Sequence, residues 1–180
     1  ELTGARSKLA AAQNRIAEAD AEIASLSNYD EVTGAHNERH FLDLLGQHRA
    51  LAVRGTYFFA LAVIEVDQYA EVVQSSGLGR GNEVLQLFSR IVRAALREVD
   101  VLARLEAERF AVILSSASEQ DAVSIINRIG QLISQIQVNE EDTVKITATA
   151  GITSYHGTEE VPELMENVCL LYTSDAADDA

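Results

Sequence analysis

The first 28 residues repeat their apolar positions with a period of seven. One position of the repeat carries large aliphatic side chains and the position three later is mostly alanine: Leu2, Leu9, Ile16 and Ile23 at the first, Ala5, Ala12, Ala19 and Leu26 at the second. A seam that combines bulky and small residues is typical of a closely packed coiled coil. We therefore predict that residues 1–28 form a parallel, dimerising helix. The alternative is a single amphipathic helix that lies on its own domain.

After residue 28 the period changes, and short apolar runs alternate with longer helical patterns. The patterns predict strands over 56–66 and 143–154, a hairpin over 100–115, and helices over 37–49, 68–75, 80–97, 118–137 and 159–168. Strands interleaved with longer helices predict an α+β fold, an α/β sandwich whose helices pack on a central, mainly antiparallel sheet. A single proline, Pro162, and the lack of a low-complexity linker indicate one domain over 29–168.

Composition narrows the class of partner. The 180-residue chain is 47% apolar and has a formal charge of −14, which argues against a general nucleic-acid binder, because such proteins need clustered Lys and Arg. No apolar run reaches the roughly 20 residues of a membrane span. The chain lacks an initiator Met and a signal-peptide pattern, so we expect a fragment of a longer cytoplasmic chain or the cytoplasmic part of a membrane-anchored one.

The last twelve residues, CLLYTSDAADDA, contain the sole cysteine, Cys169. They resemble the translated read-through of a transposase sequencing adapter. We therefore expect residues 169–180 to be a non-native tail and assign them no function.

The predicted hairpin has an unusual turn. In VDVLARLEAERFAVIL, residues 99–114, two apolar strands flank Glu106, Ala107, Glu108 and Arg109. A tight hairpin turn normally carries Gly, Asn or Asp. Two acids and an arginine, without glycine, are unusual at a bend between buried strands, and the reason for them bears on whether the chain is an enzyme.

Five stretches, in order and at consistent spacing over residues 29–168, resemble the motifs of the GGDEF family, the diguanylate cyclases that join two GTP molecules into cyclic di-GMP. The stretches are YDEVTGAHNERHF, LAVIEVDQY, SGLGRGNEVL, DVLARLEAERF and ITATAGIT. The resemblance implies a domain like nucleotide cyclases and polymerase palms. Two carboxylate-bound Mg²⁺ ions there would bridge the triphosphate during attack by a 3′-hydroxyl.

The resemblance also shows how far the signature has degenerated, from Gly-Gly-Asp-Glu-Phe to Glu106, Ala107, Glu108, Arg109 and Phe110. Glu106 and Ala107 add bulk where glycines let the backbone approach the nucleotide. Arg109 replaces a metal-binding glutamate, and at about 4 Å and an effective dielectric of about 20 each unit charge pair is worth about 4 kcal/mol. Only Glu108, and Glu65 at the family's first metal aspartate, remain as weak metal ligands, so no catalytic residue is assigned.

Contacts to the nucleotide are altered as well. The asparagine that reads the guanine edge falls on Val73, which can neither donate nor accept a hydrogen bond, and its aspartate partner falls on Asn82. The family's lysine and histidine fall on Ala70 and Leu78. We expect no cofactor, and Mg²⁺ only if some nucleotide binding survives.

A second site of the family is present in sequence. Arg97-Glu98-Val99-Asp100 precedes the degenerate signature by five residues, the spacing of the inhibitory Arg-x-x-Asp site that binds cyclic di-GMP. A guanidinium can bind phosphate or the guanine Hoogsteen edge, and a carboxylate can accept from guanine N1 and N2. Arg104 could add charge nearby. The alternative is a structural pair, with Arg97 at a helix end and Asp100 holding a turn.

The sequence therefore favours a non-catalytic GGDEF domain, dimerised by its N-terminal helix below an upstream sensor, that binds cyclic di-GMP or a protein partner. The alternatives are a working diguanylate cyclase and a GTP-binding domain without turnover, with Arg109 meeting phosphate.

Two further motifs lack the surroundings that their usual functions require. His36 and His40 lack a third zinc ligand, and the glycines of GLGRG at 77–81 link two helices instead of following a strand.

Overall fold

The computed structural model describes residues 6, 9–18, 27–55, 57–134 and 146–174, with side chains up to residue 168. The elements of the globular part are β1 (His36–Asn37), α2 (Glu38–Val53), β2 (Phe59–Val66), α3 (Tyr69–Ser76), α4 (Leu78–Ala95), β3 (Val101–Glu106), β4 (Arg109–Ser115), α5 (Glu119–Ser134), β5 (Ala148–Ser154) and α6 (Val161–Ser174).

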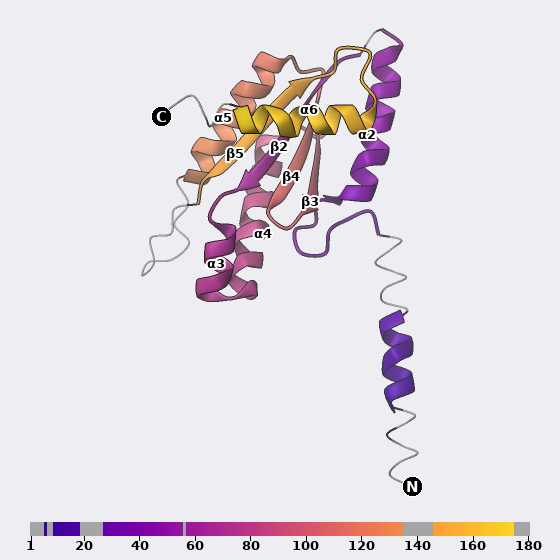
Figure 1. Cartoon of the computed structure of the whole chain (residues 1–180), viewed down its shortest axis with the longest axis vertical. Helices are drawn as coiled ribbons and strands as arrows, with labels where there is room; N and C mark the ends of the chain where they lie inside the picture. The colour runs from indigo at the N-terminus through magenta and orange to yellow at the C-terminus, as the bar shows by residue number, and fades with distance from the viewer. Residues whose placement is uncertain (1–5, 7–8, 19–26, 56, 135–145, 175–180) are drawn as a thin grey trace.

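The strands form one sheet in the order β1-β3-β4-β2-β5. The short β1 runs parallel to β3, and the other neighbours are antiparallel, which confirms the predicted mainly antiparallel sheet. Helices cover both faces: in Figure 1, α6 crosses in front of the sheet, while α4 and α5 lie behind it. The predicted α+β sandwich is therefore confirmed.

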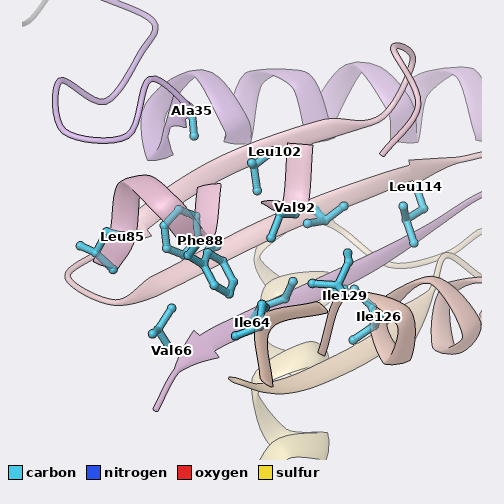
Figure 2. Packing of buried hydrophobic residues seen from close by; sticks show 14 of the residues in the cluster. Ala35, Ile64, Val66, Leu85, Phe88, Val92, Leu102, Leu114, Ile126 and Ile129 are labelled. Carbon is cyan, nitrogen blue, oxygen red and sulfur yellow. The ribbon is translucent and has the colours of Figure 1, made fainter. Parts of the chain in front are cut away.

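Alternation along β2 divides the core into two halves. Ala60, Ala62, Ile64 and Val66 join a cluster with buried residues of α4 and α5, whereas Phe59, Leu61 and Val63 join a second cluster with α2 and α6. Figure 2 shows Phe88 of α4 turned toward Ile64 and Val66. A strand buried on both faces reads as a continuous apolar run, because helices cover both sides.

Several element boundaries differ from the prediction. Helix α4 ends at Ala95, two residues early, so Arg97 lies beyond the helix and Arg93 is the basic residue of its last turn. Strand β5 begins at Ala148 instead of 143, with residues 143–145 outside the described part. Helix α6 extends past the predicted end at 168 to Ser174.

The N-terminal repeat is described only over residue 6 and residues 9–18, which are helical. Leu9 and Ile16 of the large seam position are each 61% exposed, and in Figure 1 this indigo helix stands apart from the globular part. These two seam side chains are therefore not covered by the described part of the domain. Pairing with a second copy stays a prediction. Ala12 of the small seam position is also exposed, and the remaining seam positions lie outside the described residues. No helix in the described part of the chain is long and apolar enough to cross a membrane.

Candidate functional site

The turn between β3 and β4 is tight and strained. Glu106 and Arg109 are cross-strand partners, so Ala107 and Glu108 alone form the loop, and the register shifts between Arg104 and Glu106. Ala107 adopts a φ of +36°, a left-handed conformation that disfavours a residue with a Cβ. Alanine therefore occupies position 107, although the backbone conformation there favours glycine.

Arg109 is held in place at this turn. Its Nη1 donates to Glu106 Oε1 at 2.9 Å. Across the sheet, Arg109 is the register partner of Glu65 on β2, and directly opposed side chains of an antiparallel pair lie on the same face. A guanidinium therefore neighbours one of the two weak metal-ligand candidates.

The residues present do not fit a pair of Mg²⁺ ions. Among the described residues, no group of three or more His, Cys, Asp or Glu side chains is arranged to hold a metal. The nearby carboxylate of Asp67 instead accepts hydrogen bonds from the hydroxyls of Thr147, at 2.6 Å, and Thr149, at 2.9 and 3.0 Å. Mg²⁺ demands near-ideal octahedral oxygen ligation, and a cation beside the site opposes it.

Val73, at the position where the resemblance places the base-reading asparagine, packs against the start of α4. Gly81 is buried, and a Cβ added there would lie 2.6 Å from Val73 Cγ2 and 3.0 Å from Tyr69 Cε2. Val73, at the expected base-reading position, thus covers the first turn of α4. Asn82, where the resemblance places the aspartate partner of the base-reading asparagine, follows Gly81 directly and is partly buried.

Arg104 belongs to the turn and not to the Arg97–Asp100 segment. Its Nε donates to the carbonyl of Ala107 at 2.8 Å, and its Nη1 donates to both carboxylate oxygens of Asp30, at 3.2 and 3.3 Å. Burial raises the pKa of Asp30, but hydrogen bonds from Thr33 and the charge of Arg104 bring the net pKa below its ordinary value. Arg104 thereby ties the loop before β1 to the hairpin turn.

Asp100 holds the turn that leads into β3. Its Oδ2 accepts from the backbone N–H of Arg97 at 2.9 Å, and its Oδ1 accepts from the backbone N–H of Ser115 at 3.0 Å. The structural role that the sequence offered as the alternative is thus real for Asp100. The Arg97 guanidinium, by contrast, makes no hydrogen bond or ion pair with any residue that the structure describes.

A cavity of about 310 Å³ opens beside this segment. Arg97 and Asp100 line it together, but Arg104 does not. The cavity also includes three residues that the sequence did not assign to it, namely Tyr29, His36 and Arg93. Arg93 lies in the last turn of α4 and Arg97 lies beyond it, so no helical spacing links the two residues.

The histidine pair has an arrangement unlike a zinc helix. His36 lies in β1, before the start of α2, and only His40 is helical, with ring centroids 4.8 Å apart. Burial, together with the neighbouring His40 and Arg93, lowers the pKa of His36, while the Asn28 backbone opposes this. A neutral ring follows at pH 7.

The profile of the family described as "Diguanylate cyclase, GGDEF domain" matches residues 27–169. The chain belongs to the GGDEF family. The match covers the whole sheet and both helix layers.

Relatives and solved structures agree with this GGDEF assignment. The diguanylate cyclase TpbB of Pseudomonas aeruginosa is 31% identical over 169 residues, 92% of this chain and 37% of the relative. The cyclic di-GMP phosphodiesterase NbdA of the same species is 26% identical over 166 residues, 91% of this chain and 21% of the relative. The chain thus spans well under half the length of these relatives.

Among solved structures, the coiled coil and GGDEF domain of DgcB from Caulobacter crescentus, in complex with c-di-GMP, superposes with a TM-score of 0.80 at 20% identity. It covers 98% of this chain and 95% of that one. The GGDEF domain of TpbB superposes with a TM-score of 0.74 at 27% identity, over 80% and 86% of the two chains. The DgcB likeness shows the fold of this GGDEF domain and no more.

Proposed function

We propose that this GGDEF domain is a non-catalytic member of its family that binds cyclic di-GMP in the cavity beside Arg97 and Asp100. The domain would act in the cytoplasm as the regulatory part of a longer cyclic di-GMP signalling protein, below an upstream sensor. The observation that carries the proposal is the free guanidinium of Arg97 at a cavity of about 310 Å³, which is within the range of small-ligand sites.

The case against catalysis rests on both ends of the family's nucleotide site. At the phosphate end, Arg109 pairs with Glu106 and neighbours Glu65, so a cation stands where the family places a metal-binding acid. At the base end, Val73 packs over Gly81 and offers no hydrogen bond to guanine. Neither change compensates for the other.

The case for binding rests on hydrogen-bond donors of Arg97 and acceptor positions of Asp100 that contacts within the described part of the domain do not use. A guanidinium presents five donors in a planar fork, which suits phosphate or the guanine Hoogsteen edge. Asp100 accepts two backbone N–H groups, and an ionised carboxylate has about four acceptor positions, so it can still accept from guanine N1 and N2. The bonds to backbone also fix the carboxylate before any ligand arrives.

The first test is a cyclase assay. The purified chain, incubated with GTP and either Mg²⁺ or Mn²⁺, should form no cyclic di-GMP, whereas an active diguanylate cyclase relative run in parallel should do so. Arg109→Glu restores one acid but leaves Val73 over Gly81, so it should remain inactive. Sustained product from the wild-type chain would overturn the non-catalytic assignment.

The second test is calorimetry with cyclic di-GMP. Wild-type protein should release heat, and Arg97→Ala and Asp100→Asn should each weaken binding at least tenfold, the effect of losing one charge-assisted contact of about 1.5–3 kcal/mol. Arg90→Ala removes an exposed arginine of α4 that does not line the cavity and should bind as wild type does. A wild-type chain that gives no heat would refute the receptor function.

GTP binding without turnover is tested in the same samples. A GTP-induced rise in melting temperature that Arg109→Ala abolishes would favour it. We expect no rise, because the Arg109 guanidinium is already paired with Glu106.

We also propose that the N-terminal helix dimerises the chain. The support is the exposure of Leu9 and Ile16, seven residues apart on one face of a described helix. Wild type should sediment as a dimer, and Leu9→Asp with Ile16→Asp should sediment as a monomer. The matched control, Ala10→Asp with Ala17→Asp, places the same charges at the next heptad position and should stay dimeric; equal behaviour of both pairs would contradict the coiled coil.

A further inference from the structure

The cavity beside Arg97 has an aromatic wall. Tyr29 and His36 both line it, and their rings stack with centroids 4.9 Å apart and planes 22° from parallel. Tyr29 is nevertheless 55% exposed. A large aromatic side chain that is half exposed at the mouth of a charged cavity is available for contact with a planar ligand.

The backbone holds Tyr29 in this position. Tyr29 and His36 form an antiparallel bridge, and the Ser27 hydroxyl binds both the N–H and the carbonyl of Tyr29 at 3.1 Å. The side-chain amide of Asn37 donates to the Ser27 carbonyl at 2.7 Å, which fastens the loop to the start of α2. The ring is thus placed before a ligand binds, and a preorganised contact costs less entropy on binding.

Charged side chains line the same cavity as the aromatic pair. Arg93 Nη2 donates to the Gly34 carbonyl at 2.8 Å, so its guanidinium is fixed beside the same cavity. With Arg97, it supplies two cations at a cavity that also carries the acids Glu98 and Asp100. A ligand that suits this lining combines an anionic group, hydrogen-bond donors and a flat aromatic ring, as a purine nucleotide does.

We propose that Tyr29 is a stacking platform of this site and that a guanine base of cyclic di-GMP lies against its ring. The inference rests on the proposed function and adds to it a determinant of ligand class. Stacking on an aromatic side chain is tolerant of base identity, so Tyr29 selects for a nucleobase, and Arg97 and Asp100 select for guanine.

The test compares cyclic di-GMP affinities of three variants by calorimetry. Tyr29→Ala should raise the Kd by about 5- to 150-fold, the usual effect of removing one base-stacking contact. Tyr29→Phe keeps the ring and should stay within about twofold of wild type, because the contact uses the aromatic face. Phe58→Ala is the matched control, since Phe58 is 53% exposed and lies outside the cavity lining.

The outcomes separate the two proposals. If Arg97→Ala abolishes binding while Tyr29→Ala binds as wild type does, the stacking role is wrong and the receptor function stands. If wild type itself does not bind, the receptor function fails. A measurement on the wild-type chain covers the case in which Tyr29→Ala does not fold: saturation with cyclic di-GMP should shift the Tyr29 ring resonances upfield, with assignment by comparison with Tyr29→Phe. Unshifted resonances at saturation would refute stacking.

Discussion

A single methyl group added at Gly81 tests the packing of Val73 against α4, on which the proposed loss of guanine binding partly depends. Gly81 lies in α4, and its added Cβ would stand 2.6 Å from Val73 Cγ2 and 3.0 Å from Tyr69 Cε2. Val73 is β-branched and stiff at χ1, so it cannot easily rotate away within α3. Gly81→Ala is therefore expected to separate α3 from α4 or to strain one of them.

The expected magnitude follows from two opposing terms. Overpacking of a filled interior costs about 1–3 kcal/mol, whereas replacing glycine by alanine inside a helix gains about 1 kcal/mol. The free energy of unfolding of Gly81→Ala should thus fall by up to about 2 kcal/mol. Gly79→Ala, in the same helix but with no atom within 4 Å of its added Cβ, should leave stability unchanged or raise it.

Urea unfolding followed by far-ultraviolet circular dichroism measures both changes. Val73→Ala, combined with Gly81→Ala, removes the clashing methyl, so the double variant should be more stable than the sum of the single effects predicts, by about 1 kcal/mol or more. An unfolding midpoint of Gly81→Ala at or above that of Gly79→Ala would show that Val73 does not occupy this space. Packing of Val73 over Gly81 would then no longer count against guanine binding, and only the lack of a hydrogen-bonding group on Val73 would remain.

Two further predictions concern the turn and its anchor. Ala107→Gly should raise the unfolding free energy by up to about 1.5 kcal/mol, because relief of a left-handed residue gains about 1–2 kcal/mol against a glycine entropy cost of about 0.5–1 kcal/mol; a lower urea midpoint would contradict it. Asp30→Asn should cost about 1–2 kcal/mol at pH 7 by weakening bonds from Thr33 and Arg104. Since the folded pKa of Asp30 lies below 3.8, wild type holds this advantage above that pH and loses it as pH falls further; a difference unchanged at pH 3 and below would refute the charge-based account.

Much of the architecture could be predicted because the apolar pattern is strong where the chain is buried. The run that became β2 is apolar at nearly every position, and the two strands of the hairpin flank an evident break in the pattern. Strand β1 was missed for a physical reason. It has only two residues, His36 and Asn37, and its pairing with β3 depends on a contact distant in sequence that no local periodicity records.

The candidate site could be predicted only in part. The motif positions Glu65, Val73 and Arg109 follow from order and spacing along the chain. The partners of those side chains do not, because a partner is set by tertiary geometry: the sequence does not say that Arg104 turns to Asp30 and away from Asp100. The contributions of Tyr29 and Arg93 to the cavity were missed for the same reason, since these residues are far apart in the chain and meet only in the folded domain.

The Arg97 and Asp100 side of the cavity lies far from the hairpin turn, whereas Arg104 links the loop that carries Tyr29 to that turn through Asp30 and Ala107. The family's nucleotide site depends on the hairpin turn and on the contact between α3 and α4. The cavity depends on the end of α4, the turn held by Asp100 and the loop that carries Tyr29. Asp100 binds the backbone of Ser115 at the far end of β4 from Arg109, so charge and bulk introduced at the turn lie a full strand away. At six residues and about 3.4 Å per residue, that separation is about 20 Å, about two and a half times the Debye length of about 8 Å at physiological salt. The substitution at position 109 therefore places a cation beside Glu65 without a direct electrostatic effect on Arg97, and the proposed receptor function does not require an intact metal site.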